Sequence, residues 1–307
     1  MADEGKNVVG YAPPTVALWG AGGVYRAYKD RLLDMQRRGR VRIVALADSS
    51  PHLAPYIDGI PVVRPSELAA VHADYVLVLN KRNAAEILRQ AVDECGLSSE
   101  QLLPYGILRL KGFDFARYHR LRGSGLNIVS NGSWGASTMR FLGLEHRFPL
   151  AGVCFRENDY LRFLEGFDDY LAVDDLAFID SRVDAYGRAY LAGQIGDIPV
   201  RFFAPHTPET AATMWERARH ELRAETTVVQ MHTLDRICER RFDSLTGFAR
   251  KICLVPYLTD VPSSVQVPLA HGHTVYTISV EEMFGRDFDT IPIDMISILL
   301  GCDSMAC

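Results

Sequence analysis

The sequence contains few cysteines, and no two of them form a C-x-x-C pair. Six cysteines spread over 307 residues indicate neither a zinc ribbon nor a disulfide framework, since both need cysteines at short, regular spacings. Cys302 and Cys307 stand in residues 301–307, which we expect to form a frayed tail. Thiols in such a tail are expected to be prone to oxidation rather than catalytic.

Long apolar runs are missing as well. The first twenty residues contain Asp3, Glu4 and Lys6 and lack the apolar core of a secretory signal. The late apolar run at 291–300 carries Asp294 and is too short to cross a bilayer. These absences argue against a membrane as partner, and we expect a cytoplasmic protein.

An excess of positive charge is also absent. The chain has 33 Lys and Arg residues against 38 Asp and Glu residues, a formal net charge of −5 at pH 7. This balance argues against nucleic acid as the main partner and leaves room for a small, anionic ligand. The apolar fraction of 48% is typical of a globular protein, and the length predicts two domains at about 150 residues each.

Short apolar runs and longer amphipathic stretches alternate from residue 15 to residue 110. Strands are predicted at 16–19, 41–47, 61–63 and 74–79, and helices at 24–36, from 66, and at 83–95. Because these strands are apolar on both faces, we expect a parallel sheet covered by helices. The fold class is therefore α/β, with a Rossmann-like domain at 15–110 after a flexible N-terminus at 1–14.

A basic, glycine-containing segment at 111–125 is interpreted as the connection between two domains. A second α/β domain is expected at 126–300. Its predicted helices lie at 133–142, 158–171 and 208–222, and its predicted strands at 126–130, 151–155, 198–203, 227–231, 251–255 and 274–278.

Gly20, Gly22 and Gly23 follow the first predicted strand and open the first helix, the context in which a G-x-G-x-x-G motif binds a dinucleotide. Gly22 would let the backbone approach a diphosphate, which the helix amides attract. Tyr25 stands at the third glycine position, where its ring should push helix and strand apart or cover the site. Asp48 ends the second strand, where a carboxylate can bind ribose hydroxyls and repel a 2′-phosphate, which favours NAD over NADP. Alternatively, the glycines make only a tight turn beside an empty pocket.

Ser133 lies at a predicted junction of strand and helix. Its hydroxyl can cap the helix by accepting a backbone hydrogen bond. Alternatively, with Gly135 two residues later, it resembles a nucleophile elbow, although Asn131 replaces the first glycine of G-x-S-x-G.

A nucleophilic serine needs a base, usually a histidine. The candidates are His206 and His232, and Asp235 could orient the second of these. His271 and His273 could form half of a metal site, but no third ligand is identifiable in the sequence, so we expect no metal.

Four segments of the first half carry a family resemblance. They are W-G-A-G at 19–22, A-D-S-S at 47–50, I-D-G-I-P-V at 57–62 and P-S-E-L at 65–68. Residues 15–108 resemble the small Rossmann-type module of nucleotide-sugar modifying proteins, which include polysaccharide-biosynthesis dehydratases and sugar acyltransferases. The resemblance implies a module that binds NAD or a sugar nucleotide, or that positions another domain.

Six segments carry a second resemblance. They are I-V-S-N-G-S-W-G at 128–135, L-G-L at 142–144, N-D-Y-L at 158–161, I-G-D-I-P at 195–199, W-E-R at 215–217 and S-V-Q-V-P at 264–268. Residues 126–300 resemble the uncharacterised bacterial family called domain of unknown function 1919, often named exopolysaccharide biosynthesis protein. Its members typically carry a cysteine where this chain has Ser133 and a glycine where it has Ala136. If that cysteine is a nucleophile, the resemblance implies that the Ser133 hydroxyl replaces it as a nucleophile of lower reactivity. If that cysteine is structural, its replacement by serine should have little effect on the protein.

These patterns lead us to expect a protein of polysaccharide or glycosylated-metabolite assembly that transfers a group to or from a sugar or nucleotide-linked substrate. NAD or a nucleoside-diphosphate sugar would bind at the glycine turn, and Ser133 would face the cleft between the domains. Two alternatives stay open: an NAD-dependent oxidoreductase, and a non-catalytic sensor or scaffold that binds a nucleotide sugar.

Overall fold

The computed structural model describes most of the chain and divides it into two compact units, Met1–Arg120 and Leu121–Cys307. The described residues are 12–50, 52, 54–132, 135, 139, 142–144, 148–174, 176–185, 187–203, 207–267 and 294–301. The boundary falls within helix α4 (Phe115–Gly123). The segment expected to connect two domains is therefore partly helical, and Phe115 and Tyr118 in it are fully buried.

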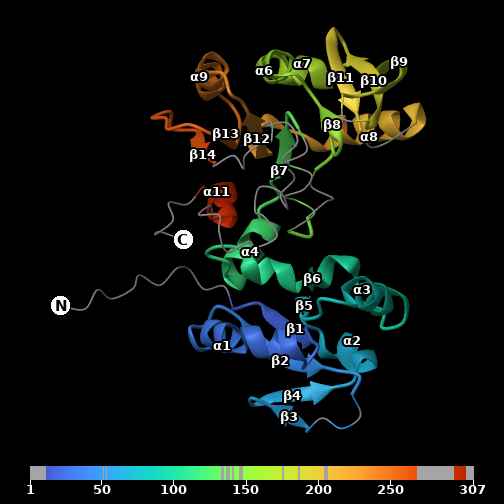
Figure 1. Ribbon diagram of the computed structural model, residues 1–307, viewed down its shortest axis with the longest axis vertical. Helices are drawn as coiled ribbons and strands as arrows, with labels where there is room; N and C mark the ends of the chain where they lie inside the picture. The colour runs from blue at the N-terminus through green and yellow to red at the C-terminus, as the bar shows by residue number, and fades with distance from the viewer. Residues whose placement is uncertain are drawn as a thin grey trace, which may run out of the picture. The chain divides into compact units, whose positions relative to one another are not determined.

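Unit 1 contains one six-stranded sheet in the order β3-β4-β2-β1-β5-β6 (Figure 1). All neighbouring strands are parallel except β3 and β4, which are antiparallel. The strands are β1 (Thr15–Trp19), β2 (Arg42–Ala47), β3 (Tyr56–Ile57), β4 (Ile60–Val63), β5 (Tyr75–Val78) and β6 (Leu102–Pro104). The helices are α1 (Gly23–Arg37), α2 (Leu68–Val71), α3 (Ala84–Asp93) and α4, with short 3₁₀ turns η1 (Pro65–Glu67), η2 (Ser99–Gln101) and η3 (Tyr105–Arg109). The alternation of strands and helices expected from the sequence is confirmed as a mixed α/β unit with a mostly parallel sheet.

The β3–β4 hairpin explains the position of Tyr25. Its two-residue turn places Asp58 and Gly59 at φ 50° and 79°, the left-handed backbone typical of tight hairpins. The buried Tyr25 hydroxyl donates a hydrogen bond to Asp58 Oδ2 over 2.9 Å, and Lys29 pairs with the same carboxylate. Both partners lower the pKa of Asp58. The Tyr25 side chain thus joins α1 to the hairpin.

Unit 2 contains two four-stranded sheets (Figure 1). The first is parallel, in the order β14-β13-β12-β7, and the second is antiparallel, in the order β8-β11-β10-β9. The parallel strands are β7 (Asn127–Ser130), β12 (Thr227–His232), β13 (Arg250–Val255) and β14 (Ser264–Gln266), and the antiparallel ones are β8 (Val153–Cys154), β9 (Leu176–Val183), β10 (Ala189–Ile195) and β11 (Ile198–Phe202). The helices are α6 (Glu157–Glu165), α7 (Phe167–Leu171), α8 (Pro208–Glu221), α9 (Arg236–Ser244) and α11 (Met295–Leu300), with a 3₁₀ turn η5 (Ala224–Thr226).

Buried aromatic side chains connect α6 to the sheets of unit 2. Phe163 stacks on Phe155 with ring centroids 5.1 Å apart and meets Phe167 edge-on at 5.5 Å. The Tyr160 hydroxyl is fully buried and donates to the carbonyl oxygen of Val129 over 2.8 Å. Because buried hydroxyl groups are costly without a partner, this bond fixes the start of α6 beside β7.

Several elements of unit 2 differ from the sequence expectations, and β14 and α11 are among those that were not predicted. The β9–β10 hairpin has no predicted counterpart, because most β9 side chains are exposed and give no apolar alternation. Helix α9 was likewise not expected. The single helix expected at 158–171 is two helices, because Gly166 leaves the helical conformation. A Cβ at Gly166 would lie 3.0 Å from the Tyr170 ring, a tight contact that glycine avoids. The strand expected at 274–278 lies outside the described residues, as does most of the helix expected at 133–142.

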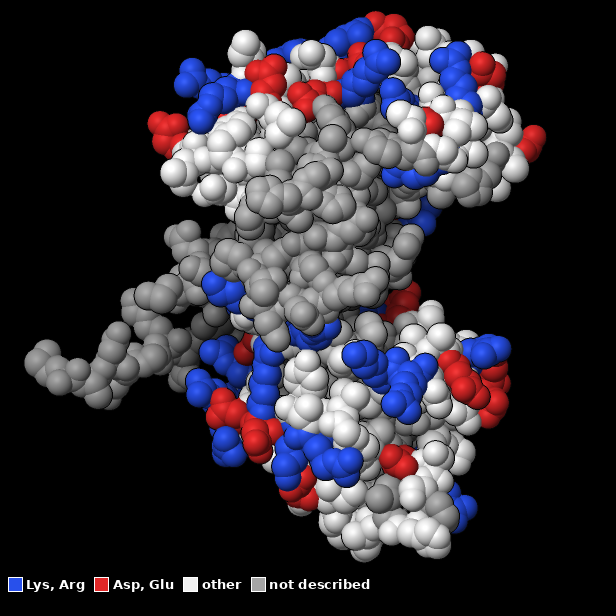
Figure 2. Space-filling model, viewed as in Figure 1, with Lys and Arg blue, Asp and Glu red and all other residues white. Residues whose placement is uncertain are grey.

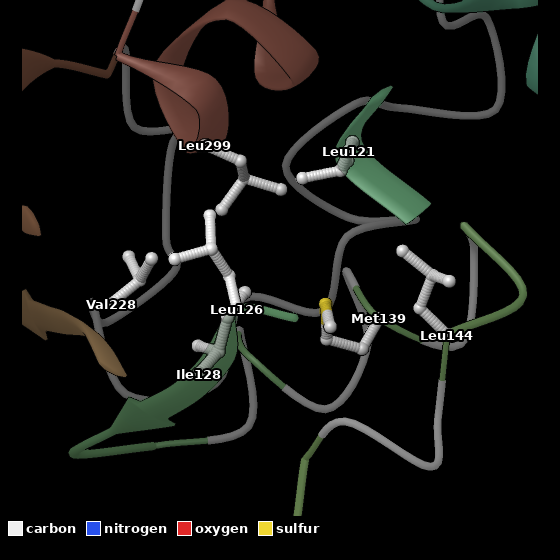
Figure 3. Close-up of a pocket in the computed structure, with 7 residues that line it drawn as sticks. All are labelled: Leu121, Leu126, Ile128, Met139, Leu144, Val228 and Leu299. Carbon is white, nitrogen blue, oxygen red and sulfur yellow. The ribbon is translucent and has the colours of Figure 1, made fainter. Parts of the chain in front are cut away.

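A small apolar cavity lies inside unit 2 (Figure 3). Seven apolar side chains surround about 10 Å³, and they are Leu121, Leu126, Ile128, Met139, Leu144, Val228 and Leu299. The volume is at the lower limit for one water molecule, and an apolar lining offers that water no partners. This cavity is therefore a packing defect and not a ligand site.

Figure 2 shows positive and negative side chains mixed over the described surface of each unit on the face drawn. Across the part of the chain that the structure describes, no helix has the length and apolar composition needed to cross a bilayer.

Candidate functional site

A larger cavity of about 570 Å³ opens in unit 2. Its volume falls within the range of about 300–1,000 Å³ that is typical of small-molecule sites. The described residues that line it are Asn131, Gly132, Gly152, Cys154, Phe155, Arg156, Arg188, Ala189, Arg201 and Phe203. Asn131 and Gly132 follow the carboxyl end of the parallel strand β7, the position where α/β sheets commonly bind ligands.

Three arginines line this cavity, and each comes from a different element. Arg156 is the N-cap residue of α6, Arg188 directly precedes β10, and Arg201 lies on β11. No carboxylate occurs among the described lining residues. Arg156 and Arg201 therefore give the described wall a positive charge that suits an anionic ligand, since arginine binds phosphate and carboxylate groups through two parallel hydrogen bonds.

Strand alternation explains why Arg201 faces the cavity. Its neighbours Val200 and Phe202 are buried in the hydrophobic core. Successive side chains of a strand point to opposite faces, so Arg201 and Phe203 project from the other face of the antiparallel sheet. Cys154 stands opposite Arg201 on the neighbouring strand β8 and shares that face.

Arg188 is anchored by Asp184. Its Nε donates to Asp184 Oδ2 over 2.8 Å, and its backbone N–H donates to Oδ1 over 2.9 Å. Among the described contacts, the Arg201 guanidinium lies over the Tyr190 ring, and neither Arg156 nor Arg201 forms an ion pair with a carboxylate. The guanidinium groups of Arg156 and Arg201 are therefore available to an incoming anion.

The Cys154 thiol also lines the cavity. Burial raises its pKa to about 11, although the positive charges of Arg188 and Arg201 act in the opposite direction. The group is therefore a neutral thiol near pH 7 and not a thiolate nucleophile.

The loop after β7 is held by its own polar side chains. The Ser130 hydroxyl donates to the carbonyl oxygen of Gly132 over 2.6 Å and accepts from the N–H of Gly135 over 3.3 Å. A Cβ at Gly135 would lie 2.6 Å from the Phe148 ring and 2.8 Å from the Ser130 hydroxyl, so any larger residue would displace one of these side chains. Ser133 follows Gly132 directly in the sequence, but its own placement lies outside the described residues.

The predicted base His232 lies at the carboxyl end of β12 and is 5% exposed. Its Nδ1 is 3.1 Å from Gln230 Nε2, and burial lowers its pKa to about 3. An imidazole with so low a pKa accepts a proton poorly near pH 7. His206, the other predicted base, lies outside the described residues.

Asp235 is the N-cap residue of helix α9. Its Oδ1 accepts from the N–H of Ile237 over 2.7 Å, which caps helix α9. Its Oδ2 is 3.7 Å from the Cys238 sulfur. Within the described contacts, the Asp235 side chain caps α9. Its pairing with His232 stays a prediction.

The glycine turn of unit 1 places Asp48 beside its backbone. The Ala21 N–H donates to Asp48 Oδ2 over 2.7 Å, and the Ser50 N–H donates to Oδ1 over 2.9 Å. Gly20 has φ 116°, and a Cβ there would lie 3.0 Å from a backbone oxygen. A Cβ at Gly22 or Gly23 would meet no atom within 4 Å. The turn is therefore open beside Gly22, while the Asp48 carboxylate already binds one of its amides.

Metal ligands do not gather in the described regions. No group of three or more His, Cys, Asp or Glu side chains in them could hold a metal ion. His271 and His273, the pair considered as half of a metal site, lie outside those regions.

Sequence reasoning missed the three arginines of the cavity. Two of them stand in the same local pattern, an arginine two residues before an aromatic residue: Arg188 before Tyr190, and Arg201 before Phe203. This repeated pattern is the one feature of the sequence that could have indicated the two arginines. It becomes informative only when the pairing of β10 with β11 is known, because that pairing brings the two segments together.

Fold and cavity together define a two-unit α/β protein whose second unit has an arginine-lined cavity. The chain belongs to the family described as Domain of unknown function (DUF1919), whose model matches residues 107–291 and so more than half of the chain. This confirms the resemblance of the second half of the sequence to domain of unknown function 1919. Residues 14–103 match a model described as C2185-like, N-terminal.

One relative of this chain is an uncharacterized protein of Haemophilus influenzae (strain ATCC 51907 / DSM 11121 / KW20 / Rd). It is 22% identical over 121 residues, which are 39% of this chain and 56% of the relative. The match thus spans little more than half of the relative's length.

Proposed function

We propose that this protein binds a phosphate-bearing sugar or nucleotide-linked substrate in the cavity of unit 2 and transfers a group to or from it. The transfer would serve the assembly of a polysaccharide or a glycosylated metabolite. The observation that carries this proposal is the convergence of Arg156, Arg188 and Arg201 on one cavity at the end of β7. Fixed guanidinium groups both bind phosphate and stabilise the negative charge that develops on a phosphate leaving group.

The chemistry proposed for the cavity needs a group that attacks or positions the substrate. Ser133 is the candidate, because it directly follows two residues that line the cavity, Asn131 and Gly132. Its hydroxyl would act as nucleophile or as a hydrogen-bond donor to a developing oxyanion. Because His232 has a low pKa, His206 is the better candidate for the base. His232 would then have a structural role and hold the loop after β7 in place.

A second candidate function belongs to unit 1, a Rossmann-like module that binds NAD or a nucleoside-diphosphate sugar. The parallel strands follow the order β4-β2-β1-β5-β6, the same pattern as in dinucleotide-binding sheets. Asp48 stands beside the glycine turn, where ribose hydroxyls bind in such folds. An NAD-dependent oxidoreductase would use this module for its chemistry, and a sensor would use it for binding alone.

A ligand panel tests these functions on the full chain. Thermal shifts are measured with nucleoside-diphosphate sugars, NAD, NADP and acyl-coenzyme A, because a ligand that binds the folded state raises the melting temperature, and at equal concentration the tighter ligand raises it more. We expect a nucleoside-diphosphate sugar to stabilise the protein and Arg201→Gln to abolish this effect. Arg217→Gln on α8, outside the cavity lining, is the matched control.

The panel also separates the alternatives. Stabilisation by NAD that Gly22→Asp removes and Arg201→Gln leaves intact would favour the oxidoreductase. Binding of a nucleotide sugar without any new covalent product in mass spectrometry, with or without acyl-coenzyme A, would favour the sensor. No response to any ligand of the panel would overturn the proposed function.

A further inference from the structure

Strand β9 forms one edge of the antiparallel sheet in unit 2. The order β8-β11-β10-β9 ends there, and among the described strands β9 pairs with β10 alone (Figure 1). The strand is eight residues long, and the five residues 179–183 are all exposed. We call these five residues the edge segment. Ile179 and Val183, at its two ends, are 54% and 65% exposed.

The edge segment has little protection against pairing with another strand. Proteins usually protect a long edge with proline, a bulge or a covering element, because its outer backbone groups can bind a further strand. The edge segment contains no proline. The ladder between β9 and β10 passes over Ile179, which forms a bulge, but the pairing from Asp180 to Val183 is regular. This part of β9 therefore keeps the extended geometry that a further strand requires.

The edge segment carries both signs of charge on one face. Asp180 and Arg182 are two positions apart, and residues two apart point to the same face of a strand. Arg182 Nε donates to Asp180 Oδ1 over 2.7 Å, in agreement with this placement. The two side chains are nevertheless 51% and 50% exposed, so each can take a second partner from a neighbouring strand.

These charges select one register for the pairing of two copies of β9. Two copies related by a twofold axis perpendicular to the sheet pair around one central residue. An axis at Asp180 or at Arg182 sets like charges directly opposite each other, which is destabilising. An axis at Ile179 runs through the bulge, and one at Val183 carries the pairing beyond the end of β9. An axis at Ser181 sets Asp180 of each copy opposite Arg182 of the other, with Cβ atoms about 5 Å apart.

We propose that this protein forms a homodimer in which β9 pairs antiparallel with β9 of a second copy, centred on Ser181. The pairing joins two four-stranded sheets into one continuous sheet and gives hydrogen-bond partners to the outer backbone groups of both edges. It forms two ion pairs between Asp180 and Arg182 of different copies. It also sets Ile179 of each copy opposite Val183 of the other. Both copies contribute the same residues, as in most dimers of identical chains.

Sedimentation velocity on the full chain at low salt tests the dimer. Because a pairing of five residues makes a small interface, we expect a monomer at about 1 µM and mostly dimer at about 300 µM. Asp180→Arg and Arg182→Asp each set like charges opposite each other at two positions, so the dissociation constant should rise at least about tenfold.

Two variants on α8 are the matched controls. Glu221→Arg and Arg217→Asp reverse the charges of another exposed ion pair, and they should leave the dissociation constant unchanged. Thermal melts identify any variant that fails to fold. A native chain that stays monomeric at every concentration would overturn the proposal. A dimer that Asp180→Arg and Arg182→Asp leave intact would also overturn it.

Recombination of the reversed charges tests the register. The double variant Asp180→Arg/Arg182→Asp again sets unlike charges opposite each other, and so does an equimolar mixture of the two single variants. Both samples should therefore dimerise as the native chain does. Failure of both to dimerise, after each single variant has weakened the dimer, would overturn the pairing of β9 with itself.

A disulfide at the twofold axis gives a second measurement of the register. The two copies of residue 181 lie opposite each other, within the Cα separation of about 4.4–6.8 Å that a disulfide spans. Oxidised glutathione should therefore link two chains of Ser181→Cys. Val183→Cys should stay unlinked at that position, because its two copies would lie about 13 Å apart along the strands. Mass spectrometry identifies the linked peptides and separates them from any formed by the native cysteines. Linkage through Val183→Cys and not through Ser181→Cys would overturn the register.

Discussion

Asn131 and His232 hold each other through two hydrogen bonds between side chain and backbone. Asn131 Nδ2 donates to the carbonyl oxygen of His232, and Asn131 Oδ1 accepts from the N–H of His232, both over 2.9 Å. Both residues are buried, and they stand at the carboxyl ends of the neighbouring strands β7 and β12. This pair fixes the loop that carries Asn131 and Gly132 into the cavity wall.

Asn131→Ala should therefore destabilise the protein strongly. The substitution removes two hydrogen bonds and leaves a buried N–H and a buried carbonyl group without their partner, which we expect to cost about 2–4 kcal/mol. Urea unfolding measures the loss. The matched control is Asn127→Ala at the start of β7, whose side chain donates one exposed bond to the carbonyl oxygen of Glu221 and should cost less than about 1 kcal/mol. Equal stability of the two variants would contradict the role given to Asn131.

Stability should fall with decreasing pH because of His232. Its folded-state pKa of about 3 lies below the value of about 6.5 expected in the unfolded chain. Below pH 6.5 the unfolded state binds a proton that the folded state rejects, so the free energy of unfolding decreases by about 1.4 kcal/mol per pH unit down to about pH 3.

His232→Gln isolates this contribution from that of the carboxylates. The free energy of unfolding of the native chain minus that of the variant should decrease by about 2 kcal/mol between pH 7.5 and pH 5. Urea unfolding at the two pH values gives both numbers. A difference that stays constant over this interval would show that His232 titrates normally in the folded protein.

The first half of the chain was largely predictable from its sequence. Its apolar strands and amphipathic helices have strong periodic signals, and Asp48 was expected at the end of the second strand, beside the glycine turn. The partner of Tyr25 was not predictable, because Asp58 belongs to a hairpin whose first strand is only two residues long. A pattern that short carries no periodicity.

The cavity was not predictable, because its arginines become neighbours only through the antiparallel sheet. Strand β9 is exposed along most of its length, so the hairpin that carries Arg188 gave no apolar signal. Arg156 and Arg201 are 45 positions apart in the sequence and meet only in the folded unit. The carboxyl end of β7 was predictable, since Asn131 and Gly132 follow an apolar strand.

Gly20 and Gly22 should respond differently to substitution by alanine. Gly20 has φ 116°, and a Cβ there would lie 3.0 Å from the Leu79 carbonyl oxygen, so Gly20→Ala should destabilise the protein by about 1–3 kcal/mol. Gly22 has φ −79° and open space around it, so Gly22→Ala should change stability by less than about 0.5 kcal/mol. Chemical unfolding of both variants measures the difference. Equal losses would show that the backbone of the turn differs from the one described.

The reactivity of Cys154 reports the electrostatics of the cavity. Because its pKa is about 11, only about one thiol in three thousand is ionised at pH 7.5, and alkylation by iodoacetamide should be slow there. The labelling rate should rise about tenfold per pH unit until the pKa is reached or the protein unfolds. Peptide mapping by mass spectrometry distinguishes Cys154 from the other cysteines.

Arg201→Gln should make Cys154 labelling slower still at a given pH. The positive charge of Arg201 lowers the pKa of this thiol against the effect of burial, so its removal allows the pKa to rise. Arg217→Gln on α8 should leave the labelling rate unchanged and serves as the control. Faster labelling in Arg201→Gln would mean that the arginine side chain shields the sulfur from the reagent more than its charge activates it. In that case Arg201 would lie across the mouth of the cavity and not along its wall.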